Sequence, residues 1–549
     1  MKKIFLTFMA AVMASASLLA QAPTTFKNPI LSGFHPDPSI TRVGDTYYLV
    51  NSTFEWFPGL PVHKSKDLVN WELAGYAISR PEQTPFKDGL PDSGGMFAPT
   101  IRYHEGLFYV ICTAIGAGGN FIVTAKDPAG EWSDPIWLKD APGIDPSLYW
   151  EDGRCYYAGN GNLNPKVDKW YGKAGVWMQE VDVKTGKMIG ERVQLTFGHA
   201  TNARWTEGPH IYKVGDTYLL MVAEGGTGEF HSTTVYHSKE LFGPYTTNQV
   251  NPVLTHRHLG YTYPITQPGH TDLIQTQNGD WWAVMLGKRP VERNCMLARE
   301  TFLTKVEMTY PDGELTPMFN PGVGLVQLEQ ERPDLPWTPV PARKVRDDFD
   351  SQTLDSQWNF LRTPMSSWYK IENGEMVINL RSEVITKLVN PSLIAQRVKT
   401  HRFTSSTKVT FSTKKDNEKA GFVYYRNSKH HFQLLKSKDR VTLIKSFVEY
   451  GDKPSIIVKT HSEVVAEVPY TANSVVFRVV AEGIEGQFFY GESVDDMKPI
   501  GGVQDISIIG DEKALKFNGS YIGMYATSDG QTSTNKAKFD WFEQIPACN

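Results

Sequence analysis

Three short motifs place an acid beside a proline or a glycine at the start of an apolar strand. They are FHPDPSI, which contains Asp37, GIDPSL, which contains Asp145, and TEGPHI, which contains Glu207. A fourth motif of similar form, GHTDL, carries His270 in place of an acid. Two carboxyl groups on opposite sides of a bond can donate a proton and activate water, provided that the fold brings them together.

Each motif is weak evidence when it is taken alone, because an aspartate before a proline commonly opens a turn. As a set, the acids fit the cleavage of a glycosidic bond by inversion, which needs a protonated carboxyl and a carboxylate roughly 6.5 to 9.5 Å apart. A third acid nearby would raise the pKa of its neighbour and keep it protonated. The prolines after Asp37 and Asp145 predict extended backbone at both acids, which would hold their side chains stiffly.

A repeat along the chain supplies the elements that would position these acids. Five tight turns, each followed by an aromatic-rich strand, occur at Gly44, Gly106, Gly153, Gly215 and Gly279. Each turn is preceded by a short strand, and this pattern is typical of propeller blades of four strands. Residues 28–325 are therefore predicted to form a five-bladed β-propeller. The alternative, a β-sandwich with extra strands, does not explain five matching turns.

The repeat predicts where the motifs meet. Counting back three residues from the first apolar residue of each leading strand gives five equivalent positions. They are Asp37, Ala98, Asp145, Gly208 and His270. Glu207 directly precedes one of them. Because the first strands of all blades surround the central channel, the three acids and the histidine are expected to face a common cavity.

A second domain follows the propeller. Residues 326–345 contain four prolines and are predicted to be an extended linker. Residues 346–549 show alternating strands and regular turns, which predict a β-sandwich of the jelly-roll, concanavalin-like kind. The fold class is therefore all-β. No sequence in this domain is typical of a metal site or a phosphate loop.

Composition excludes several classes of function. The 549 residues are too many for one ordinary core, and the net charge of -4 offers no basic surface for nucleic acid. The aromatic fraction of 12% suits short strands and also stacking on sugar rings. Four scattered cysteines are too few for a disulfide scaffold, and a single bridge cannot be assigned.

The N-terminus resembles a secretory signal. Lys2 and Lys3 precede an apolar run that ends in small residues, so residues 1–20 are predicted to be a signal peptide. The run is short for a membrane anchor. We expect an exported protein, periplasmic or secreted, that does not insert into a membrane.

The motifs together resemble glycoside hydrolase family 43, in its α-L-arabinofuranosidase and β-D-xylosidase branch with a C-terminal β-sandwich. Matching stretches include NPILSGFHPDPSI, DSGGMFAPTI, GIDPSLYWEDGR and LARETFLTKVEM, and they run in family order. The resemblance implies that Asp37 is the general base and Glu207 the general acid. Asp145 is implied to orient Glu207 and tune its pKa.

The same resemblance assigns substrate contacts. Arg299 is implied to reach the bound sugar, although by itself it could equally form a surface ion pair. His270 would line the floor of the pocket, and Phe54 and Phe97 are expected either to wall it or to belong to the core. No cofactor is expected to be required and no metal site is predicted, although in some relatives the matching histidine holds a calcium ion, so the resemblance allows a structural calcium near His270.

The expected activity is an inverting exo-glycosidase that removes terminal α-L-arabinofuranosyl residues from plant cell-wall oligosaccharides, with β-D-xylosidase or dual specificity as the alternative. A non-catalytic carbohydrate-binding propeller is the alternative of a different class. The sandwich could be an independent glycan-binding module. Its stretch FNGSYIGMYATSDG resembles a loop that approaches the pocket in some relatives, with Tyr521 as the candidate contact or as an ordinary strand residue. The sequence predicts no oligomeric state.

Overall fold

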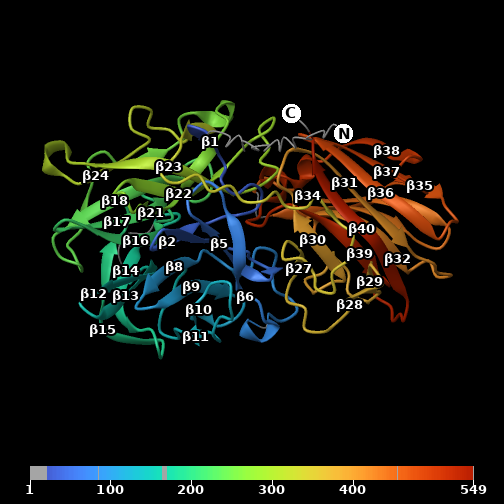
Figure 1. Cartoon of the computed structure of the whole chain (residues 1–549), viewed down its shortest axis with the longest axis horizontal. Helices are drawn as coiled ribbons and strands as arrows, with labels where there is room; N and C mark the ends of the chain where they lie inside the picture. The colour runs from blue at the N-terminus through green and yellow to red at the C-terminus, as the bar shows by residue number, and fades with distance from the viewer. Residues whose placement is uncertain (1–21, 85, 164–169, 454–455, 548–549) are drawn as a thin grey trace, which may run out of the picture.

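The computed structural model describes residues 22–84, 86–163, 170–453 and 456–547. Its two domains lie side by side along the long axis of the molecule, the propeller in blue to yellow and the sandwich in orange to red (Figure 1). The predicted all-β fold, a five-bladed propeller followed by a concanavalin-like sandwich, is confirmed. The predicted signal peptide, 1–20, lies outside the described residues. No described helix is long and apolar enough to cross a bilayer.

Five sheets form the blades, and each is built from one continuous stretch of chain with antiparallel neighbours. Blade 1 contains β2 (Ser39–Val43), β3 (Thr46–Val50), β5 (Gly59–Ser65) and β6 (Glu72–Ile78). Blade 2 contains β7 (Gly95–Met96), β8 (Thr100–His104), β9 (Leu107–Ile115), β10 (Gly119–Ala125) and β11 (Ile136–Trp137). Blade 3 contains β12 (Ser147–Glu151), β13 (Arg154–Asn160), β14 (Val176–Asp182) and β15 (Lys187–Thr196).

The last two blades follow the same plan. Blade 4 contains β16 (Glu207–Val214), β17 (Thr217–Glu224), β18 (Ser232–Ser238), β19 (Thr246–Thr247) and β20 (Leu254–Thr255). Blade 5 contains β21 (Thr266–Gln275), β22 (Trp281–Lys288), β23 (Glu300–Thr309) and β24 (Thr316–Phe319). The helices are short: η1 (Pro81–Gln83), η2 (Gly260–Thr262), η3 (Pro311–Gly313), η4 (Ser507–Ile509) and α1 (Asp511–Ala514).

The five glycine turns lie where the sequence predicts them. Each connects the first two strands of its blade, except in blade 2, where Gly106 connects β8 to β9. Each glycine has a positive φ, from 62° at Gly44 to 92° at Gly279. Tight hairpins need this left-handed backbone, which glycine adopts without steric cost. The repeat of five matching hairpins is therefore real.

A buried carboxylate joins four blades at the propeller axis. Asp272 of β21 accepts hydrogen bonds from Ser39 of β2 (2.6 Å), Arg102 of β8 (2.8 Å) and Tyr212 of β16 (2.5 Å). Burial opposes its ionisation, but the Arg102 guanidinium lowers the pKa of Asp272. This network fixes the first strands of the blades relative to one another.

Two short strands close the propeller. β1 (Thr25–Lys27) pairs antiparallel with β25 (Glu329–Glu331), so the segment before blade 1 is bound to the segment after blade 5. β25 falls inside the range 326–345 that the sequence assigns to a linker. The rest of that range contains no helix or strand.

The second domain packs two sheets face to face. The first sheet contains, in spatial order, β28 (Tyr369–Glu372), β29 (Glu375–Asn379), β40 (Lys536–Pro546), β31 (Arg402–Thr410), β36 (Ser474–Glu482), β37 (Glu485–Gly491) and β38 (Met497–Asp505), with β26 (Arg346–Asp347) also paired to β40. The second contains β35 (Ile457–Pro469), β34 (Arg440–Tyr450), β33 (His430–Lys436), β32 (Lys419–Asn427), β39 (Tyr521–Thr527), β30 (Leu393–Arg397), β27 (Asn359–Leu361) and β4 (Trp56–Phe57).

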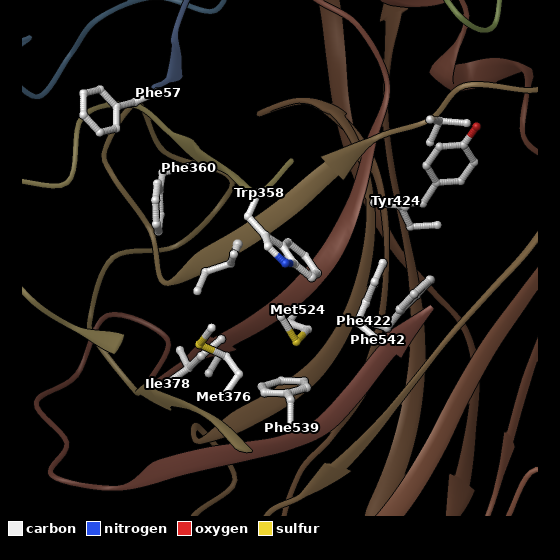
Figure 2. Close-up of a cluster of buried hydrophobic side chains, with 14 of the residues drawn as sticks. Phe57, Trp358, Phe360, Met376, Ile378, Phe422, Tyr424, Met524, Phe539 and Phe542 are labelled. Atoms are coloured by element: carbon white, nitrogen blue, oxygen red, sulfur yellow. The ribbon is translucent and has the colours of Figure 1, made fainter. Parts of the chain in front are cut away.

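The sandwich core is apolar and is drawn from both sheets. Figure 2 shows Met376 and Phe539 of the first sheet close to Met524 of the second, and all three are fully buried. β4 comes from the propeller, yet it forms the edge of a sandwich sheet, where Phe57 pairs with Phe360 (Figure 2). The two domains therefore share a sheet.

Candidate active site

One cavity, of about 340 Å³, brings together every residue that the sequence singles out for chemistry. Those residues are Asp37, Phe54, Phe97, Asp145, Glu207, His270 and Arg299. The cavity lies at the propeller axis, and Phe517 of the sandwich contributes to its wall. Residues from all five blades thus converge on one site.

The backbone is left-handed at four of the five equivalent blade positions, Ala98 being the exception. The φ angles are 50° at Asp37, 54° at Asp145, 60° at Gly208 and 50° at His270. The extended backbone predicted for Asp37 and Asp145 is therefore wrong, because the turn into each inner strand overrides the bias that a following proline imposes. Among non-glycine residues, aspartate and histidine adopt this conformation comparatively readily, and it occurs often at functional sites.

Gly208 shows why the acid of blade 4 sits one residue earlier. A Cβ atom at Gly208 would lie 2.7 Å from Nε2 of His270, too close for any side chain. Only glycine fits beneath the imidazole at this position, so the carboxyl group that reaches the cavity comes from the preceding residue, Glu207.

Asp37 is the most firmly held of the three acids. Arg299 donates to it from Nη1 (2.6 Å) and Ser52 donates to its other oxygen from Oγ (2.6 Å). Nδ1 of His270 lies 3.7 Å from the carboxylate. With 3% of its surface exposed, Asp37 is a buried carboxylate whose charge is balanced by a guanidinium.

The other two acids lack such a partner, and their protonation changes accordingly. Burial and the charge of Asp37 raise the pKa of Glu207 to about 8. Burial and the charges of Glu207 and Asp37 raise the pKa of Asp145 well above its usual range. Of the two, Glu207 therefore carries a proton at neutral pH.

Arg299 is not a surface ion pair, since it is 5% exposed. Besides donating to Asp37, it donates from Nη2 to the backbone oxygen of Phe517 (3.0 Å). Its guanidinium carbon lies 5.1 Å from the ring centroid of Phe54 and 5.6 Å from that of Phe517. Arg299 thus connects a propeller acid to the sandwich, and a sugar would meet only its remaining N–H groups.

Three phenylalanines form an aromatic wall. The ring of Phe54 lies 5.1 Å from that of Phe97 and 5.9 Å from that of Phe517. Phe54 also belongs to a buried apolar cluster, so it serves both the core and the cavity. Such rings can pack against the apolar face of a sugar.

The sandwich reaches the cavity through Phe517 and not through Tyr521. Tyr521 is fully buried and stacks on Trp56, with ring centroids 3.6 Å apart. Phe517 is held by its backbone N–H, which donates to Ser93 of the propeller (2.9 Å). The stretch that contains both aromatics was recognised in the sequence, but nothing in it distinguishes the aromatic that enters the pocket.

Six further propeller residues line the cavity without having been predicted: Ile144, Trp205, Gly226, Thr227, His231 and Leu286. Trp205 lies two residues before Glu207, a proximity that could have signalled it. His231 is buried, and burial lowers the pKa of its imidazole to about 3, so it is a neutral group here. Neither Thr227 nor His231 lies in a repeated motif.

The donors around His270 do not fit a calcium site. Calcium prefers six or more oxygen ligands, whereas both nearby carboxylates are engaged, Asp37 by Arg299 and Asp272 by Arg102. Within the described ranges, no group of three or more His, Cys, Asp and Glu side chains could hold a metal ion. The described cysteines, Cys112, Cys155 and Cys295, are free and buried, and Cys548 lies outside the described residues.

Comparison with known proteins agrees with this geometry. The family model described as Glycosyl hydrolases family 43 matches residues 26–314. The chain belongs to glycosyl hydrolase family 43. A second model, described as Beta xylosidase C-terminal Concanavalin A-like domain, matches residues 346–544. The resemblance seen in the sequence is confirmed, and the protein is a glycoside hydrolase.

Relatives within family 43 match over nearly the whole chain. A non-reducing end α-L-arabinofuranosidase of Bacteroides ovatus is 39% identical, over 98% of both chains. A xylosidase/arabinosidase of Butyrivibrio fibrisolvens is 38% identical, over 94% of this chain and 98% of its own. The solved structure titled "Bacteroides ovatus Xyloglucan PUL GH43B" has a TM-score of 0.84 and 38% identity, covering 95% of this chain and 100% of that one.

Proposed function

We propose that this family 43 enzyme is an inverting exo-glycosidase that removes terminal non-reducing α-L-arabinofuranosyl residues from plant hemicellulose fragments. The observation that supports it most strongly is that the buried acids differ in their charge partners and in their pKa values. One carboxylate is paired with Arg299, while Glu207 has a pKa of about 8 and so carries a proton at neutral pH. Inversion needs these two states at once.

Glu207 is the proton donor in this proposal. As the bond between the anomeric carbon and the leaving oxygen breaks, the Glu207 proton moves to that oxygen, so the aglycone leaves as a neutral alcohol. The raised pKa keeps Glu207 protonated at neutral pH. The nearby Asp145 would orient Glu207 and, when charged, raise its proton affinity further.

Asp37 is the water activator. A water molecule loses a proton to Asp37 while its oxygen forms the new bond to the anomeric carbon, on the face opposite the leaving group. Ser52 and Arg299 hold the carboxylate in one orientation, which limits the motion that would misplace the water. The aromatic wall would receive the apolar face of the pentose.

The preference for arabinofuranosides rests on the name of the Bacteroides ovatus relative. The Butyrivibrio fibrisolvens relative is named for both sugars, so β-D-xylosidase or dual activity is the second candidate. The experiment is the release of 4-nitrophenol from the α-L-arabinofuranoside and the β-D-xylopyranoside. A kcat/KM for the arabinofuranoside at least tenfold above that for the xyloside is expected, and the reverse order would overturn the first choice.

The stereochemical outcome is tested separately. Proton NMR of the first turnovers should show the released sugar with the anomeric configuration opposite to that of the substrate. Initial release with the same configuration would contradict inversion while leaving the choice of sugar untouched.

Export is the remaining part of the proposal and rests on the pattern of residues 1–20. Expression of the full chain in a Gram-negative host should give mature protein outside the cytoplasm, with a new N-terminus near residue 20 by mass spectrometry. An unprocessed cytoplasmic product would contradict it.

A further inference from the structure

A second cavity lies between the propeller and the sandwich, away from the acids. Its volume is about 190 Å³. His35 and His63 of the first blade region face it from the propeller, Arg397 and Lys399 face it from the sandwich, and the segment after β25 contributes its own side chains. Three stretches distant in the sequence therefore meet here.

Most of the titratable residues that line this cavity are basic: His35, His63, Arg343, Lys344, Arg397 and Lys399. The one other is Tyr76. No aspartate or glutamate lines it, and none of its arginines and lysines forms an ion pair with a carboxylate in the described part of the chain. Asp355 attracts Lys399 only weakly, less than Arg343 and Arg397 repel it.

Three buried polar atoms of residues that line this cavity lack a partner within the described residues: Nη2 of Arg397, Nδ1 of His63 and Nε2 of Gln544. Arg397 is 6% exposed and donates from Nε to the oxygen of Phe34 (2.9 Å) and from Nη1 to Asn359 (2.8 Å), but its Nη2 makes no hydrogen bond. His63 is 4% exposed, and its Nδ1 is likewise unpaired. An unpaired buried donor is costly, and here it adds to the cost of burying the charge of Arg397.

We propose that this cavity is a binding site for a small oxyanion, lined by the buried Arg397 and half-buried Lys399 of the sandwich and by the exposed Arg343 and Lys344 of the segment after β25. Guanidinium and ammonium groups bind such anions through charge-assisted hydrogen bonds. The anion could be free phosphate or sulfate, or the carboxylate of an acidic sugar. Bound there, it would connect the propeller to the sandwich.

The pKa values of the basic residues that line the cavity agree with the lack of a nearby negative charge. Burial and the charge of Arg343 and Arg397 lower the pKa of Lys399 to about 8. Burial, followed by the charge of Arg397, lowers the pKa of His35 well below its usual range. Sulfate keeps its charge between pH 7 and 9, so its affinity should fall about tenfold over that range as Lys399 loses its proton.

The test is calorimetric titration of the full-length mature enzyme at constant ionic strength, with sodium phosphate, sodium sulfate and sodium D-glucuronate in separate experiments. Saturable one-to-one binding of at least one anion is expected, without competition against the 4-nitrophenyl substrate. Binding of phosphate or sulfate alone identifies a free inorganic anion, and binding of glucuronate alone identifies a sugar acid.

Variants locate the site. Arg343→Gln and Lys399→Gln should each weaken binding about tenfold, because each removes a charge-assisted contact. Lys459→Gln, on the exposed strand β35, is the matched control and should bind as the wild type does. Retained glycosidase activity shows that each variant is folded.

Two results would overturn the proposal: no saturable binding of any of the three anions, or equal affinity in Arg343→Gln, Lys399→Gln and Lys459→Gln. Both readouts are binding constants. They therefore stay separate from the substrate preference proposed above.

Discussion

Two cavities with lining residues from both domains, the candidate active site and the basic cavity, differ in how buried charge is balanced. In the active site, the charge of Asp37 is balanced by Arg299, and the remaining acids have raised pKa values that favour their neutral forms. In the basic cavity, Arg397 remains charged and incompletely hydrogen-bonded, with no described carboxylate to balance it.

The difference indicates what each cavity is for. A buried carboxyl group lowers the cost of its burial by taking up a proton. It can then donate that proton to a substrate, which suits catalysis. An arginine cannot lose its proton at ordinary pH, so the buried charge of Arg397 can be balanced only by a counter-charge. In the proposal above, a bound anion supplies it.

The largest expected effect is at Asp37. Asp37→Asn keeps the shape of the side chain but removes the proton acceptor, so kcat should fall about 10³-fold. The exposed substitution Asp45→Asn is the matched control and should leave kcat within about twofold of wild type. Wild-type turnover by Asp37→Asn would mean that this carboxylate is not the general base.

The next effect concerns the pH dependence set by Glu207. Because its pKa is about 8, kcat/KM should fall about tenfold for each pH unit above that value, as the proton donor is lost. The residual activity of Glu207→Gln should lack this alkaline limb. A limb that persists in the variant would assign it to another group.

The raised pKa of Glu207 also predicts how the stability of the protein depends on pH. Its folded pKa is raised from 4.5 to about 8, so the folded state holds this proton more tightly than the unfolded state between those values. The contribution of Glu207 to the free energy of unfolding should therefore be fully present below about pH 4.5 and be lost as the pH rises to 8. Glu207→Gln should raise the melting temperature at pH 8 but not at pH 4, and Glu131→Gln, at an exposed site, should change neither.

A smaller effect is expected at the sandwich contribution to the active site. Phe517→Ala removes part of the aromatic wall, and because the ring is 46% exposed, we expect KM to rise only about threefold to tenfold. Phe242→Ala, a partly exposed phenylalanine on blade 4, should leave KM unchanged. An unchanged KM for Phe517→Ala would separate the sandwich from substrate binding.

The smallest effect is at the basic cavity. In buffer without phosphate or sulfate, Lys399→Gln should stabilise the protein by about 1 kcal/mol because it removes a repelled charge. Thermal unfolding with added sulfate should cancel or reverse this gain, since the wild type then binds the anion more tightly. Stabilisation that is independent of sulfate would contradict a site there.

The propeller could be predicted from the sequence because each blade is marked by a short motif, a glycine turn followed by a strand. The turn at Gly44 and its four counterparts need a residue with left-handed backbone, and the glycine at each of these positions indicates this requirement. The equivalent blade positions then followed by counting, which brought Asp37, Asp145 and His270 to one cavity. Local reasoning failed at the backbone of the acids, where the tertiary turn into the inner strand outweighs the bias from proline.

Contacts between domains could not be predicted in this way. Phe517 and Tyr521 are four residues apart in one recognised stretch, but which of them enters the cavity depends on how the sandwich docks. Likewise, His63, Arg343 and Lys399 carry no shared pattern, and only the fold brings them to one place. Sequence periodicity describes a blade and contains no information about what packs against it.

The strand β4 has a consequence for the order of synthesis. It leaves the ribosome with the first blade, long before β27, the strand with which it pairs. Trp56 and Phe57 of a newly synthesised propeller therefore stay exposed until the sandwich has been synthesised and has folded. A chain cut after blade 5 would keep this apolar edge exposed, and a sandwich made alone would lack its border strand, so neither half is a natural unit for expression.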